Sequence, residues 1–149
     1  MGSAGFWDHQ DAAKGVVSEL KLIKAATDAR KNAYAPFSKF LVGAALETED
    51  GRIITGCNCE SASYGLTICA ERVAVFKAHS EGIRGAKRVA VVADTSEPTP
   101  PCGACRQWLW EFGGDVEVIL ANLDGEKARY RLAVLLPLAF DARLLGVTG

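Results

Sequence analysis

The spacing of apolar residues predicts that the chain starts with a helix and continues into two paired strands. Between residues 11 and 32, apolar side chains recur at intervals of three and four, as on the buried face of an amphipathic helix. Pro36 follows, and the chain becomes extended there because proline excludes the residue before it from helical geometry. Residues 40–48 and 52–57 are apolar runs of strand length, and the Asp-Gly turn between them is typical of a β-hairpin.

Strands and helices alternate along the rest of the chain. Residues 58–68 are polar and irregular, so we expect a loop that delivers side chains to a site. The elements expected next are a helix at 69–81 ended by a left-handed Gly82, a strand at 87–94, a proline-containing loop at 95–101, a helix at 102–112, and strands at 116–121 and 127–134. Residues 135–140 are ambiguous. This order predicts an α/β fold, a three-layer α/β/α arrangement with a mixed five-stranded sheet.

Length and composition predict one domain that binds neither a polyanion nor a membrane. At 149 residues and 49% hydrophobic, the chain suits a single core, so we interpret residues 1–149 as one domain with a flexible tail at residues 1–10. Lysine and arginine number 17 against 18 acidic residues, which argues against a nucleic-acid partner. We find no apolar run of the roughly 20 residues that a membrane span requires and no signal peptide, so we expect a cytoplasmic protein.

Three of the five cysteines stand where a metal ion could be held. Cys102 and Cys105 are three residues apart at the start of an expected helix, so their sulfurs share one face. Cys69 starts another expected helix and could complete the set. The N-terminus of a helix stabilises a thiolate, which is the form that zinc binds. Three thiolates would leave the fourth tetrahedral position of zinc to a water molecule, as in catalytic sites.

Two residues next to Cys69 suit the chemistry of such a site. Zinc lowers the pKa of its bound water to about 7, which makes hydroxide available in neutral solution. Glu71 could take the proton from this water and pass it to the substrate, because a carboxylate both accepts and donates. Arg72 could donate hydrogen bonds to the sulfurs and offset the negative charge of three thiolates and a hydroxide.

The motifs Cys-Ala-Glu at residues 69–71 and Pro-Cys-x-x-Cys at residues 101–105 match the signature of zinc-dependent deaminases. From residues 34–40 to residues 136–140, the chain resembles the homotetrameric cytidine deaminase family. The resemblance implies a cytidine deaminase-like fold, one Zn²⁺ per subunit, and hydrolysis of free cytidine and deoxycytidine to uridine, deoxyuridine and ammonia in pyrimidine salvage. The residues that it assigns are the zinc ligands Cys69, Cys102 and Cys105, the catalytic Glu71, and the substrate contacts Phe40, Asn58, Glu60, Ala70 and Phe140.

Within this resemblance, Asn58 and Glu60 contact ribose hydroxyls, Phe40 lines the pyrimidine site, and Phe140 reaches the site of a neighbouring subunit. A homotetramer with shared active sites is therefore expected. The negative charge of Glu60 favours a nucleoside over a nucleotide, because it repels a phosphate. Two departures from the family pattern, Ser61 and Leu138, leave the substrate range open.

Three alternatives follow from the same residues. The first is a deaminase of modified cytosine nucleosides or of antibiotics of the blasticidin type. The second is a non-catalytic zinc module in which Cys57 or Cys59 supplies a fourth thiolate, although we expect both to pack as small hydrophobic side chains. The third is a nucleic-acid deaminase, which should carry a basic groove and which the neutral charge disfavours. His9 and His79 are expected at the surface, and Trp108 and Trp110 in the core or in a subunit contact.

Overall fold

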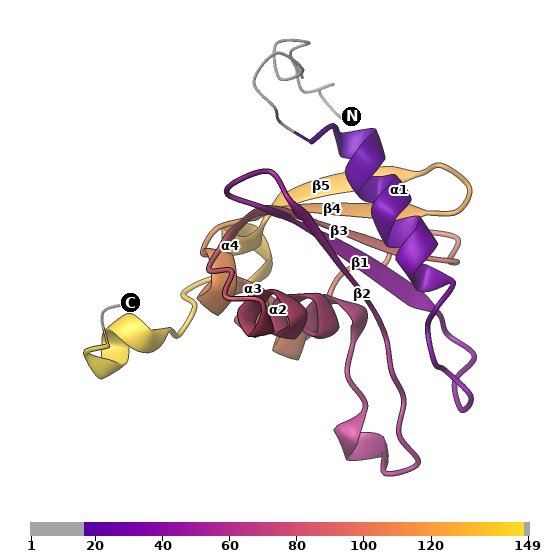
Figure 1. Ribbon diagram of the computed structural model, residues 1–149, viewed down its shortest axis with the longest axis horizontal. Coiled ribbons are helices and arrows are strands. Elements are labelled where there is room, and N and C mark those ends of the chain that lie inside the picture. The colour runs from indigo at the N-terminus through magenta and orange to yellow at the C-terminus, as the bar shows by residue number, and fades with distance from the viewer. Residues whose placement is uncertain (1–16, 148–149) are drawn as a thin grey trace.

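The computed structural model describes residues 17–147, and these form a mixed five-stranded sheet with helices on both faces (Figure 1). The strands lie in the order β2-β1-β3-β4-β5. β3 and β4 run parallel, and the other neighbours are antiparallel. Their bounds are Val42–Thr48 for β1, Ile53–Cys57 for β2, Ala86–Ala93 for β3, Glu117–Asn122 for β4 and Lys127–Arg131 for β5. The predicted mixed sheet of five strands is confirmed.

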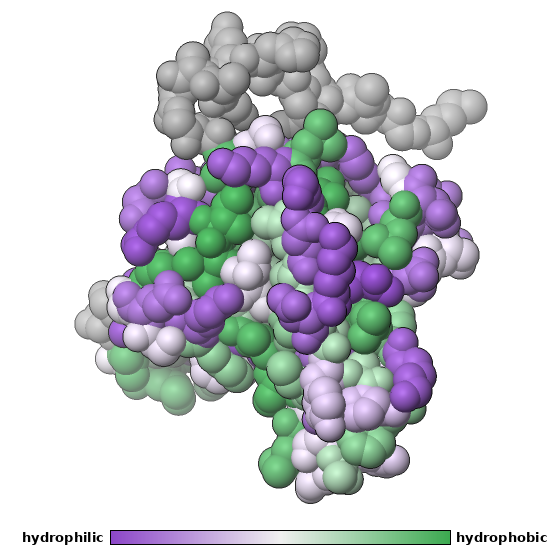
Figure 2. All heavy atoms as spheres, turned by 45° about the vertical axis from the view of Figure 1, so that its right-hand side comes forward, coloured by the Kyte–Doolittle hydropathy of each residue, from purple (hydrophilic) through white to green (hydrophobic). Residues whose placement is uncertain are grey.

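The helices make the outer two layers of the predicted three. Helix α1 (Glu19–Arg30) covers one face of the sheet, and α2 (Ala70–Ser80) and α3 (Gly103–Gly113) cover the other (Figure 1). Each face buries its own hydrophobic cluster, with Leu22 and Ile119 on the α1 side and Val75 and Leu109 on the other. Hydrophilic side chains form a band along the outer side of α1, as its amphipathic pattern requires (Figure 2).

The first helix begins later than the sequence pattern suggests. Ser18 has an extended backbone, and its hydroxyl accepts a hydrogen bond from the amide of Lys21 at 3.2 Å, which caps the helix before Glu19. The predicted helical residues 11–16 and the predicted tail lie outside the described residues. At the other end of the second helix, Gly82 has φ +79°, so the predicted left-handed termination is confirmed.

The prediction of a strand over residues 127–134 is wrong beyond Arg131. Residues Leu132–Leu135 form a short helix, α4, because tertiary contacts turn the chain. Leu132 is completely buried, and its amide donates to the carbonyl of Val116. The carboxylate of Asp115 accepts from the amide of Ala133 at 2.8 Å, which satisfies the start of the helix. Beyond the ambiguous segment, a 3-10 helix, η3, spans Ala142–Leu145.

The irregular segment between β2 and α2 is a loop, as predicted, with a 3-10 turn, η2, at Tyr64–Leu66. Cys59 pairs with Ile68 across this loop through two backbone hydrogen bonds of 2.9 and 3.0 Å, so its two ends are held together. The loop therefore returns the chain to the start of α2 beside the end of β2. No helix among residues 17–147 combines the length and apolar character needed to cross a membrane.

Candidate active site

The three cysteines singled out in the sequence meet where α2 and α3 begin. Cys69 and Cys102 are the residues that cap these helices, and both have an extended backbone, while Cys105 lies in the first turn of α3 and is buried. The three sulfurs lie within 4.8 Å of one another, and those of Cys69 and Cys102 are 3.8 Å apart. A tetrahedral zinc ion with Zn–S bonds of about 2.3 Å needs sulfurs about 3.8 Å apart, so the cluster fits this metal.

Arg72 contacts the cluster from the first turn of α2. Its Nη2 donates to the sulfur of Cys69 at 3.3 Å, and its buried Nε has no hydrogen-bond partner among residues 17–147. Burial disfavours the charge of Arg72, but the hydrogen bonds to Cys69 and Cys105 outweigh it and raise the pKa of the guanidinium. A permanent positive charge therefore lies against the thiols, and it suits the extra negative charge that all three acquire on binding zinc.

The thiols do not ionise alike. A hydrogen bond from the Cys105 thiol, helped by Arg72, lowers the pKa of Cys69 to about 5. The same hydrogen bond, together with burial, raises the pKa of Cys105, because its proton is shared with the Cys69 thiolate. Of this hydrogen-bonded pair, Cys69 is therefore the thiol that ionises more readily.

Glu71 is buried beside the cluster, with 4% of its surface exposed. Burial raises the pKa of Glu71 to about 7, and the negative charge of Cys69 acts in the same direction. A carboxyl group with such a pKa holds and releases a proton with similar ease in neutral solution. This is the property that a group needs if it both accepts and donates a proton in one reaction.

A cavity of about 280 Å³ opens onto these groups. Of the residues predicted for the site, those that line it are Phe40, Asn58, Glu60, Cys69, Ala70, Glu71 and Cys102. The structure thus brings together side chains from the segment before β1, the loop after β2 and the starts of α2 and α3. Sequence reasoning missed six further lining residues, which are Ser38, Val42, Thr67, Val91, Thr99 and Pro100. Ser38 lies in the 34–40 motif, of which Phe40 alone was predicted to contact the substrate.

Asn58 stabilises the backbone that lines the cavity at the start of β1 by two side-chain hydrogen bonds. Its Nδ2 donates to the carbonyl of Phe40 at 2.7 Å, and its Oδ1 accepts from the amide of Val42 at 2.8 Å. The side chain is buried, at 8% exposed. One amide hydrogen remains for a further acceptor, since a primary amide donates two.

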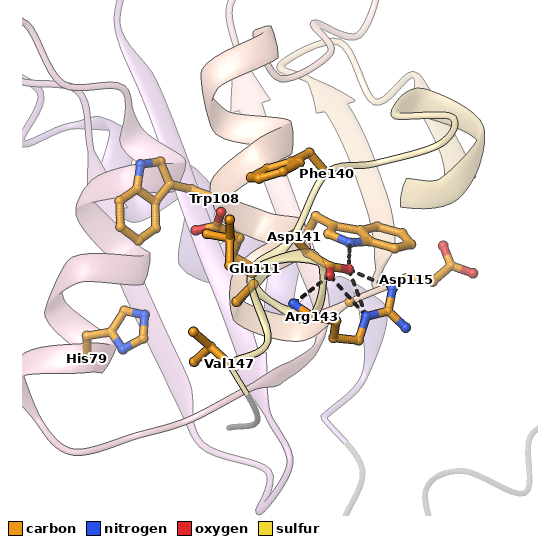
Figure 3. A pocket seen from close by; sticks show the side chains of 12 residues that line it. His79, Trp108, Glu111, Asp115, Phe140, Asp141, Arg143 and Val147 are labelled. Carbon is orange, nitrogen blue, oxygen red and sulfur yellow. Dashed lines mark hydrogen bonds and ion pairs between the residues drawn. The ribbon is translucent and has the colours of Figure 1, made fainter.

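Phe140 lies apart from this cavity in its own chain. Its carbonyl accepts from Nε2 of Gln107 at 2.8 Å, and the residue is 53% exposed. With Trp108 it lines a second cavity, of about 690 Å³, between the C-terminal segment and α3, where Figure 3 shows both side chains. Asp141 anchors this segment by accepting from Trp110 Nε1 at 3.0 Å and from the guanidinium of Arg143.

The remaining cysteines differ in part from expectation, and His79 lies partly buried beside Phe112. Cys57 is half-buried and Cys59 is exposed, so Cys59 does not pack as a hydrophobic side chain. Neither belongs to the three-thiol cluster found within residues 17–147, which leaves the closed four-thiolate site unsupported. His79 is half-buried, with its ring 5.0 Å from that of Phe112 between centroids, and burial lowers its pKa. His9 lies outside the described residues.

Three thiols placed to share one metal ion, next to a buried carboxyl group, define the class of zinc-dependent deaminases. A family described as the cytidine and deoxycytidylate deaminase zinc-binding region matches residues 17–122. The chain therefore belongs to the zinc-binding cytidine and deoxycytidylate deaminase family, and the predicted enzyme class and zinc cofactor are confirmed.

Individual relatives agree with this family. The chain is 56% identical to a cytidine deaminase of Halalkalibacterium halodurans over 81% of this chain and 92% of that protein. It is 54% identical to a cytidine deaminase of Sporosarcina psychrophila, over 81% and 90% of the two chains. The crystal structure of a cytidine deaminase from Burkholderia pseudomallei superimposes with a TM-score of 0.81 at 49% identity, over 83% of this chain and all of that one. The cytidine deaminase-like fold expected from the sequence is thus confirmed.

Proposed function

We propose that the protein is a cytidine deaminase that hydrolyses free cytidine and deoxycytidine to uridine and deoxyuridine with release of ammonia, as a step of pyrimidine salvage. The observation that carries the proposal is the buried carboxyl group of Glu71 in the same cavity as the thiols of Cys69 and Cys102. The relatives named above are cytidine deaminases, which supports the same substrate class.

In this proposal, Cys69, Cys102 and Cys105 would hold the zinc ion, which would supply a bound water acidic enough to yield the hydroxide that attacks C4 of the base. Glu71 takes a proton from that water and delivers it to the ring nitrogen N3. Glu71 then moves the second proton to the departing amine, which leaves as ammonia. Arg72 offsets the charge of the thiolates by its hydrogen bond to Cys69.

The cavity walls supply the substrate contacts. Phe40 and Ala70 present apolar surface to the pyrimidine ring, and Asn58 and Glu60 present polar groups to the sugar. Because the Glu60 carboxylate repels a phosphate group, a free nucleoside binds better than its nucleotide. The two departures from the family pattern stay outside the cavity lining: Ser61 is half-buried in the loop after β2, and Leu138 is fully exposed. This placement favours ordinary cytosine nucleosides over antibiotics of the blasticidin type.

We further propose a homotetramer in the cytoplasm. Phe140 is half-exposed and does not line the cavity of its own chain, so a role in catalysis requires a neighbouring subunit. The segment that carries it exposes apolar side chains that an interface would cover, namely Leu138, Leu144, Leu145 and Val147. A reducing compartment suits a site whose three ligands are thiols.

The test is the fall in ultraviolet absorbance of cytidine and of deoxycytidine with the zinc-loaded protein, run beside Glu71→Gln. We expect the wild type to convert both nucleosides and the variant to convert neither at a comparable rate. If the zinc-loaded wild type left both unchanged, ordinary cytosine nucleosides would be excluded as substrates, and base-modified analogues would be tested next.

A further inference from the structure

The Glu60 carboxylate accepts hydrogen bonds from Phe37 and Ser38, the two residues that follow Pro36. The amide of Phe37 donates to its Oε2 at 2.9 Å, and the amide of Ser38 donates to Oε2 at 3.1 Å and to Oε1 at 3.3 Å. The hydroxyl of Ser38 donates to Oε1 as well. Three donors from consecutive residues therefore converge on one side chain that belongs to a different segment of the chain.

The Ser38 hydroxyl also contacts Phe40, the residue proposed to lie against the pyrimidine base. Its oxygen accepts a hydrogen bond from the amide of Phe40 at 3.0 Å. Because this amide occupies a lone pair of the oxygen, the hydroxyl hydrogen is left free to point at Glu60. The Ser38 hydroxyl thus connects two residues that line the cavity by hydrogen bonds: Phe40 before β1 and Glu60 in the loop after β2.

This arrangement determines what Glu60 can still bind. An ionised carboxylate accepts about four hydrogen bonds, and the three donors of residues 37 and 38 leave about one position for a ligand. The Ser38 hydroxyl is the main cause that lowers the pKa of Glu60, followed by the amides of Phe37 and Ser38, with a smaller contribution from Lys39. The carboxylate of Glu60 therefore stays ionised and keeps one acceptor position free. A neutral hydroxyl can donate to this position, whereas a phosphate is repelled by its charge.

We propose that Ser38 is a positioning residue that orients the Glu60 carboxylate toward the sugar and thereby sets the selectivity of the enzyme for nucleosides with a 3′-hydroxyl. The 3′-hydroxyl is the ring hydroxyl that cytidine and deoxycytidine share. This inference rests on the proposed function. Without the Ser38 hydroxyl, a half-buried glutamate regains rotamer freedom, and its ordering must then be driven by substrate binding.

The experiment measures kcat and KM of the zinc-loaded enzyme with cytidine and with 3′-deoxycytidine for the wild type, Ser38→Ala and Ser38→Thr. We expect Ser38→Ala to lower kcat/KM for cytidine about tenfold, mainly through KM, since a hydrogen bond to a charged group is lost. For 3′-deoxycytidine the change should stay within about twofold. Ser38→Thr keeps a hydroxyl and should restore most of the cytidine activity.

Ser63→Ala is the matched control, because Ser63 is an exposed serine of the neighbouring loop that does not line the cavity. It should leave both substrates unaffected. An equal loss for both substrates in Ser38→Ala would overturn the proposal, because the role would then be structural. A further tenfold loss on adding Ser38→Ala to Glu60→Gln would overturn it too, since the hydroxyl would act independently of Glu60. Absence of turnover by the wild type would instead overturn the proposed function and this inference together.

Discussion

Glu71 keeps a carboxyl group almost completely out of water, although burial disfavours its charged form and raises its pKa to about 7. Glutamine has nearly the same shape but carries no titratable proton, so Glu71→Gln separates proton transfer from packing. We expect kcat to fall by about 10²–10⁴, while zinc bound per chain, measured by atomic emission, stays at the wild-type level. A variant that lost its zinc in parallel with its activity would instead assign Glu71 to the metal site.

Arg72 places its guanidinium against the thiol cluster from the first turn of α2. Its guanidinium donates to the Cys69 sulfur, and Arg72→Met removes both this hydrogen bond and a positive charge next to three thiols. We expect zinc affinity to fall by about tenfold or more, measured by competition with a chromophoric chelator. Arg84→Met is the control, because Arg84 lies after the other end of the same helix and donates to the backbone carbonyls of His79 and Ile83. Equal affinities for the two variants would contradict the assigned role.

At the scale of elements, α2 lies against β2 with no space for another carbon atom at Gly56. A Cβ added there would come within 2.4 Å of the Ala70 carbonyl and 2.5 Å of the Ala74 amide nitrogen, so α2 would have to move. Gly56→Ala should therefore lower the free energy of unfolding by about 1–3 kcal/mol, measured in urea, and reduce zinc binding, because Cys69 starts this helix. Gly65→Ala, where a Cβ meets nothing within 4 Å, should change neither property.

A row of alternating charges crosses the sheet on the α1 side. Glu47, Arg88, Glu117 and Arg131 are register partners on β1, β3, β4 and β5. Glu47 is completely buried and pairs with Arg88, and both also bind the backbone of Val17, so the row fastens the chain just before α1. Glu117 is half-buried, and burial raises its pKa. The sheet thus holds the start of α1 by ionic as well as apolar contacts.

Breaking the buried pair of this row should be costly. Arg88→Met leaves the Glu47 carboxylate buried without its partner, and we expect the free energy of unfolding to fall by about 3–5 kcal/mol. The double variant Glu47→Leu with Arg88→Met should recover most of this loss, because no charge then remains unpaired. Arg52→Met, which breaks the exposed pair with Asp50, should leave the free energy of unfolding close to that of the wild type, because water screens exposed charges. Urea unfolding at one fixed protein concentration compares the three.

At the scale of the whole molecule, the position of Phe140 predicts that subunits complete one another. We expect sedimentation to show four times the mass of one chain, and Phe140→Ala to raise KM while the assembly persists. Glu71→Gln subunits supply an intact Phe140, so exchanging them with Phe140→Ala subunits should restore part of the activity. Mixed assemblies with no more activity than the sum of the two parents would place the function of Phe140 within its own chain.

The sequence by itself determined the features that depend on neighbours along the chain. Strand and helix periods predicted the sheet and its three layers, and Gly82 predicted the end of α2. The spacing of Cys102 and Cys105 places two sulfurs on one face of a helix turn whatever lies around it. The Cys-Ala-Glu and Pro-Cys-x-x-Cys motifs predicted the cluster because their chemistry allows few other uses.

Only the tertiary structure decided contacts between segments that are distant in sequence. The Asp115 carboxylate accepts a hydrogen bond from the amide of Ala133, and the Val116 carbonyl accepts one from the amide of Leu132. These two contacts turn an apparent strand into α4. Ser38 reaches Glu60 across 22 positions of the chain, and Cys69 meets Cys102 across 33. Such pairings depend on how α2, α3 and the loops pack on the sheet. The spacing of apolar residues within one segment does not predict them. Packing and burial also raise the pKa of Glu71, because water is excluded by residues from several elements at once.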